Sequence, residues 1–137
     1  MNLDELRTAW APRLLSVLRI MAALLLLQYG TAKLLGFPEH KFLNEVPAFS
    51  LFWFAGWFEL IGGALLLIGL FTGPVAFVLS GEMAIAYFHD HAPRSFFPLL
   101  NRGDLAALFS FVFLYLACAG GGAWSIDALL KARRNKL

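Results

Sequence analysis

The sequence places charged residues inside segments that are otherwise apolar. Glu59 and Glu82 lie near the middle of two apolar stretches, and Arg19 lies inside a third. A charged side chain in the hydrocarbon of a membrane costs several kcal/mol unless it is paired or hydrated, so such residues usually face the protein interior and mark a functional site. These three residues are therefore the centre of the predicted site.

Lys33 and His89 join this predicted site through their helical spacing. At about 100° per residue, Lys33 lies within about 40° of Arg19, and His89 follows Glu82 by about two turns on the same face. Both glutamates fall midway along their segments, with Arg19 towards one end and Lys33 and His89 towards the other. We therefore predict an interior column of ligand-binding residues, in which Glu59 and Glu82 are the catalytic candidates.

Two glutamates beside one arginine can carry out proton chemistry. If Arg19 pairs with one carboxylate, the other is left beside a like charge in a poorly solvating medium, so it can hold a proton at neutral pH. Such a carboxyl can donate a hydrogen bond to a quinone carbonyl or pass its proton towards His89. The alternative is that Arg19, Glu59 and Glu82 form a buried salt bridge that fixes the register of the helices.

The histidines and the cysteine indicate no metal centre. His89 and His91 are two residues apart, so on a helix they face different sides, and with His40 they still give an incomplete ligand set. We therefore predict no metal site and no haem held by two histidines. A single cysteine, Cys118, excludes an internal disulfide and a CxxC redox pair. No cofactor motif is present, and a quinone is the cofactor that the carboxyl chemistry fits.

The elements that position these residues are four apolar blocks in a chain of 137 residues, 60% of them hydrophobic. The blocks cover residues 14–35, 49–70, 74–89 and 104–119. The first two have the length of about 20 residues that a membrane crossing needs, and the last two need their flanks to complete one. The sequence thus predicts an all-α fold, an integral membrane antiparallel four-helix bundle, as one domain over residues 1–137.

The segments outside the blocks predict caps, turns and surface helices. Residues 2–13 have apolar residues at helical spacing, which indicates a short interfacial helix before the first span. Residues 71–74 form a tight turn that makes the second and third spans a hairpin, and Asn101 with Asp104 resembles a capping box before the fourth. Ser125 is the expected cap of a final basic helix.

Charge distribution predicts the orientation. The two termini carry six basic residues, against four in the loops and helix ends on the opposite side, so the positive-inside rule places both termini in the cytoplasm. The protein is then a multi-pass membrane protein. The net charge of +2 comes from these flanks and favours anionic lipid headgroups as contacts, with no nucleic acid partner.

The chain resembles the DoxX family of small four-helix bacterial membrane proteins. The resemblance lies in LLSVLRIMAALLLLQYGTAKLLGFP, FELIGGALLLIGLFT and SGEMAIAYFHDHAPRSFFPLLNRGDLAALFSFVFLYLACAGGGAWSID, including Gly30, Gly62, His91, Asn101 and Asp127. Members often read asparagine, two glycines and glutamate where this chain has residues 101–104. The family is named for a subunit associated with a terminal quinol oxidase, and related proteins act in thiosulfate to quinone oxidoreduction or oxidative-stress defence. The resemblance implies a membrane redox context and a location in the cytoplasmic (inner) membrane of a bacterium.

Three functions follow from these features. The first is the membrane subunit of a redox system, quinone-linked or linked to oxidative stress, that binds a quinone-like or other small apolar molecule in the bundle. The second is a non-enzymatic scaffold for a soluble or membrane oxidoreductase, with the basic tail as docking surface. The third is a small proton-coupled transporter, which at this length would need to form a homo-oligomer.

Overall fold

The computed structural model describes residues 1–137 and consists of helices and the segments that connect them. The elements in order are α1 (Leu3–Leu35), η1 (Leu43–Glu45), α2 (Leu51–Ile68), α3 (Thr72–Ala86), η2 (Tyr87–His91), η3 (Ala92–Arg94), α4 (Pro98–Asn101), α5 (Asp104–Ala119) and α6 (Ile126–Arg134). The all-α prediction is confirmed. α1 and α2 are long and apolar enough to cross a membrane, and α5 is a shorter apolar helix.

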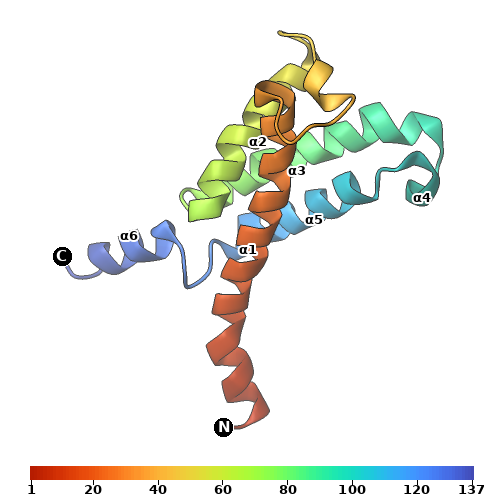
Figure 1. Cartoon of the computed structure of the whole chain (residues 1–137). Coiled ribbons are helices and arrows are strands. Elements are labelled where there is room, and N and C mark those ends of the chain that lie inside the picture. The colour runs from red at the N-terminus through yellow and green to blue at the C-terminus, as the bar shows by residue number, and fades with distance from the viewer.

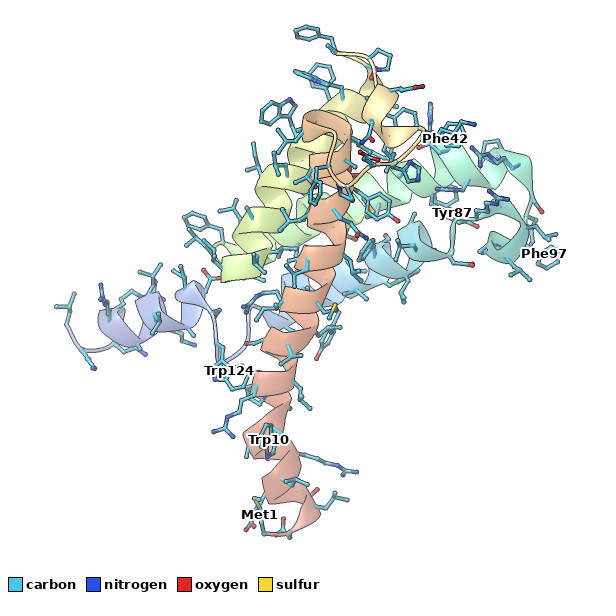
Figure 2. All side chains as sticks on the ribbon, in the orientation of Figure 1. Met1, Trp10, Phe42, Tyr87, Phe97 and Trp124 are labelled. Carbon is cyan, nitrogen blue, oxygen red and sulfur yellow. The ribbon has the colours of Figure 1, made fainter.

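The predicted N-terminal interfacial helix is not a separate element. α1 runs unbroken through Pro12 for 33 residues, about 50 Å at 1.5 Å per residue. A capping box starts it, because the Asn2 side chain accepts from the Glu5 amide at 2.8 Å while the Asn2 amide donates to the Glu5 carboxylate at 3.0 Å. The first turns of α1 project beyond the other helices, and Trp10 lies on this projection (Figures 1 and 2).

Two pairs of helices build the body of the molecule. α1 packs along α2, and α3 packs along α5, while α2 and α3 touch less extensively (Figure 1). Ser80 and Ser110 join the second pair, since each hydroxyl donates to the other's backbone carbonyl at 2.7 and 3.1 Å. The buried apolar core draws on all four helices and consists of Ala22, Ala23, Leu26, Leu66, Ala76, Leu79, Met83, Phe109, Phe113 and Leu116.

The outer faces of the helices are apolar. Only 25 of the 137 residues are buried, and large exposed side chains such as Phe77, Ile85 and Phe111 cover the outside of the helices. A soluble protein rarely exposes continuous apolar surface on this scale. The surroundings that these faces require are therefore apolar too.

The helix ends follow the predicted cap residues in part. Ser125 caps α6 as expected, by accepting from the Ala128 amide at 3.1 Å. The capping box expected at Asn101 and Asp104 is wrong, because Gly103 precedes α5 and Asn101 closes the short helix α4. Asn101 is instead fully buried, where it accepts from the Gly103 amide and donates to the Ser95 carbonyl. It therefore orders the connection between α3 and α5.

Candidate functional site

A buried ion pair joins the last turn of α1 to the middle of α2. Lys33 Nζ lies 2.8 Å from Glu59 Oε1, and the two side chains are 7% and 5% exposed. Glycines bring the backbones together here: a Cβ on Gly30 would lie 2.7 Å from the Leu60 nitrogen, and one on Gly56 would meet the Lys33 side chain at 3.1 Å. The small residues therefore let α1 approach α2 closely enough for the lysine to reach the carboxylate.

Glu82 brings a second carboxyl to this pair from α3. It interacts electrostatically with both Glu59 and Lys33. Neither carboxyl oxygen of Glu82 has a hydrogen-bond partner, and Oε2 of Glu59 has none either, although all three atoms are buried. Ionised carboxylates only accept hydrogen bonds, so the two glutamates cannot satisfy each other unless a proton lies between them. The site thus combines one cation, two carboxyls and unmet hydrogen-bonding capacity.

A cavity of about 360 Å³ opens beside the three charged groups, and we call it the ring cavity. α2 and α3 supply most of its walls, which include Phe52, Phe54 and Phe58. Its full lining is Lys33, Leu51, Phe52, Phe54, Ala55, Phe58, Glu59, Val78, Gly81, Glu82, Ile85, Ala86, His89 and Asp90. An apolar cavity of this size with a few converging polar groups is the usual form of a small-molecule site.

A further cavity of about 290 Å³, the loop cavity, lies between α1, α5 and the connection from η2 to α5. It shares Lys33, Glu59 and Asp90 with the ring cavity and adds the basic residues Arg94 and Arg102. The Lys33–Glu59 pair therefore borders both an apolar cavity and a more polar one.

His89 lies at the edge of the site and not in its interior. Its side chain is 60% exposed, and Nδ1 lies 2.7 Å from the Asp90 carboxylate. Both residues belong to η2, a single π-helical turn that continues α3, and both border the ring cavity. π-helical turns inside helices often occur at functional sites. His89 thus marks the mouth of the cavity, two turns away from Glu82 as the spacing predicts.

Arg19 is not part of this cluster, and the predicted network of Arg19 with Glu59 and Glu82 is wrong. Arg19 is 1% exposed, and its guanidinium donates to backbone carbonyls: Nε to Leu66 at 2.8 Å, Nη2 to Trp124 at 2.8 Å, and Nη1 to Gly121. It therefore joins α1 to the end of α2 and to the segment between α5 and α6, where Figure 2 shows Trp124 beside α1.

Gly69 makes room for this arginine. It ends α2 with a φ of 70°, and a Cβ there would lie 3.0 Å from the guanidinium carbon and 2.5 Å from the Ser125 Cβ. Both the left-handed backbone and the close approach favour glycine.

Two further acidic residues, Asp127 and Asp90, have contacts that the sequence did not predict. Asp127 of α6 accepts from the amides of Phe71 and Thr72, both at 2.9 Å, and so caps α3 from a distant part of the chain. Asp90 borders both cavities. The pattern Asn-x-x-Glu at residues 2–5 is a local signal for the start of α1, whereas no local signal reveals the contacts of Asp127.

The comparisons with known proteins point to one family. A model of the DoxX family matches residues 14–92, more than half of the chain. A protein of Haemophilus influenzae described as uncharacterized is 42% identical over 130 residues, covering 92% of this chain and 94% of its own length. No solved structure matches the chain. The matched segment contains α2, α3 and all five predicted site residues.

Proposed function

We propose that this chain, which belongs to the DoxX family of membrane proteins, crosses the bacterial cytoplasmic membrane four times and binds a quinone-like ring as the membrane subunit of a redox system. The four spans of this proposal are α1, α2, α3 continued by η2, and α5, arranged as an antiparallel bundle. The apolar outer faces of these helices and the connections at their ends support the four-span arrangement. Both termini then lie in the cytoplasm, in agreement with the distribution of basic residues.

The observation that carries the ligand proposal is the pairing of an apolar cavity with buried carboxyl oxygens that lack partners. The three phenylalanine side chains of the ring cavity suit a flat ring, and Lys33, Glu59 and Glu82 add polar groups to its wall. Lys33 Nζ is a donor for a ring carbonyl, and a proton shared by Glu59 and Glu82 is another. A hydrophilic ligand would gain little from these walls, whereas a quinone matches both the apolar and the polar parts.

In this role the chain would manage protons while a partner supplies electrons. Reduction of a quinone to the quinol takes two electrons and two protons. The Glu59–Glu82 pair lies where it can deliver a proton to a carbonyl oxygen in the ring cavity, and Asp90 with His89 lies at the cavity mouth, where protons are replenished from solvent. The electrons come from a soluble or membrane redox protein, the partner that this proposal requires.

The test measures binding of a tailless benzoquinone to the purified protein in lipid nanodiscs by equilibrium dialysis. Glu82→Leu should weaken binding at least tenfold, because a hydrogen bond to a buried polar group is lost, about 1.4 kcal/mol or more. Glu45→Gln, on the exposed turn η1, is the matched acidic control and should bind as the unchanged protein does. If the unchanged protein binds no quinone, or Glu82→Leu binds it equally well, the proposal is wrong.

One observation favours a second function, the scaffold for a redox enzyme. α6 extends away from the other helices and carries Lys131, Arg133 and Arg134 in its last turn (Figure 1). A basic exposed helix suits an acidic surface on a partner. Reversing these three charges to glutamate should abolish capture of the native partner enzyme and leave quinone binding unchanged if α6 is the docking element, whereas unchanged capture would reject the scaffold role.

A further inference from the structure

The outer surface between α2 and α3 has an apolar groove of about 380 Å³, which we call the tail groove. Phe58, Ile61 and Leu65 border it on α2, and Pro74, Val75 and Val78 border it on α3. Phe58 and Val78 also line the ring cavity, so the two hollows are adjacent and share a wall. Together they follow the α2–α3 seam from Leu51 to Leu65, about 21 Å along α2 at 1.5 Å per residue.

The position of the tail groove leaves it open to the surroundings of the protein. α1 packs against the face of α2 that carries Gly56 and Gly63, whereas Gly62 faces Leu79 of α3 at the base of the groove. Ile61 and Val78 at its rim are 55% and 50% exposed. In a bilayer this rim faces lipid, so a ligand can reach the groove sideways from the membrane without crossing water.

We propose that the tail groove holds the isoprenoid-type apolar tail of the molecule whose ring occupies the ring cavity, and that this molecule enters laterally from the bilayer. This inference rests on the proposed function and adds to it the substrate class, a tailed quinone, and the route of entry. The tail leaves the ring cavity between Phe58 and Val78 and runs towards Leu65 and Val75. The ring then sits beside Glu59 and Glu82, which lie close to the junction of the two hollows.

The charges that line the ring cavity favour a tailed quinone over an ordinary phospholipid. With a proton shared by Glu59 and Glu82, the ring cavity still holds two carboxylate charges, one on that pair and one on Asp90, against the single charge of Lys33. His89, which also lines the cavity, lies against Asp90 at its edge. A phosphate headgroup placed there would meet an excess of negative charge in a poorly solvating environment, which is strongly unfavourable. An uncharged ring has no such cost, and it gains donors for its carbonyls. The combined site therefore selects an apolar tail with a neutral head.

The test uses a benzoquinone that carries a photoreactive diazirine at the end of a ten-carbon tail, with the full-length protein in nanodiscs. After irradiation, mass spectrometry should find the label on the peptides that contain Leu65 and Val75. An excess of unlabelled tailed quinone should abolish this labelling, and an excess of phospholipid should not. Labelling elsewhere in the chain, or labelling that phospholipid removes as well as quinone does, would overturn the proposal.

Two matched variants separate the tail from the ring. Val75→Trp fills the tail groove, and Val17→Trp places the same side chain on the exposed face of α1, away from the cavities described above. Val75→Trp should weaken binding of the ten-carbon quinone at least tenfold and change binding of the tailless ring less than twofold, whereas Val17→Trp should change neither. Equal effects of Val75→Trp on both ligands would contradict a separate tail site.

Other occupants give different results in the same experiments. A second copy of the chain in the groove would produce cross-links between subunits and a Val75→Trp variant of altered oligomeric state, and either result would overturn the proposal. If the tailless ring does not bind at all, the proposed function fails. If the ring binds but the tail label lies outside the groove, only the tail proposal fails.

Discussion

Replacing Lys33 with methionine removes the cation that contacts Glu59 and leaves Glu59 and Glu82 buried side by side. Methionine keeps most of the length and apolar volume of the lysine side chain, so packing between α1 and α2 changes little. Breaking a buried ion pair by removing one partner typically costs about 3–5 kcal/mol, because the remaining charge stays buried and uncompensated. The side chains of Lys33 and Glu59 are 7% and 5% exposed, so the pair is buried and this range applies to it.

Removing the other partner should cost less. In Glu59→Gln, Lys33 still has Glu82 within electrostatic reach, so the cation keeps a counter-charge. We expect a loss of about 1–2 kcal/mol, which is the cost of one weakened hydrogen bond and its reorganisation. The double variant Lys33→Met with Glu59→Gln contains neither buried charge of the pair and should lie within about 1 kcal/mol of the unchanged protein.

The assay is unfolding by SDS in mixed micelles, followed by circular dichroism, for the two single variants and the double variant. The cycle should give a coupling energy of about 3 kcal/mol or more, with Lys33→Met less stable than Glu59→Gln. Lys136→Met, near the exposed C-terminus, is the control and should not change stability. The reasoning is refuted if Glu59→Gln is the more damaging single change, or if the effects of the two substitutions simply add.

Three further predictions concern the packing of the helices and their orientation in the membrane. Arg19→Met should destabilise the protein by about 3 kcal/mol or more, since it removes the guanidinium hydrogen bonds to the carbonyls of Leu66, Gly121 and Trp124. Binding of the tailless quinone should not change; a lost ligand with intact stability would contradict this. Gly30→Ala should cost about 1–3 kcal/mol in the same unfolding assay because its Cβ meets the backbone of α2, whereas Gly81→Ala, with open space around its Cβ, should be neutral or stabilising by up to about 1 kcal/mol. In a Cys118→Ala background, single cysteines at Glu45 and Asn135 should react with an impermeant thiol reagent from opposite sides of the membrane, and reaction from the same side would reject the four-span arrangement.

Much of the fold could be predicted because apolar blocks and cap residues are local signals. The block at residues 104–119 coincides with α5, and the block at 49–70 differs from α2 only at its ends, where Ser50 caps the helix and Gly69 closes it. The unbroken α1 was not predicted, although the Asn2–Glu5 capping box that starts it is visible in the sequence. The π-helical turn η2 could not be predicted, because helical spacing alone does not show where the backbone widens.

The partner of Glu59 could not be predicted because it depends on the register between α1 and α2. A helical wheel places Arg19 and Lys33 on one face but says nothing of their level against the next helix. Arg19 lies level with Leu66, near the end of α2, which puts it about 10 Å or more along the axis from Glu59. The connection of residues 36–50 is long enough to allow several registers. Only the close packing of Gly30 on the backbone at Glu59 selects the one that brings Lys33 to the carboxylate.

The two cations of α1 also differ in the partners that suit them. The guanidinium of Arg19 has five donors in a planar fork, so it can satisfy several carbonyls at the end of α2 and in the segment after α5 without any carboxylate. The ammonium of Lys33 is a compact charge and satisfies one carboxylate oxygen of Glu59. Because Arg19 is committed to backbone carbonyls, Lys33 remains the one cation for two buried carboxyls. That imbalance leaves the Glu82 oxygens free to take a proton or meet a ligand, which a closed salt bridge between one arginine and both glutamates would have prevented.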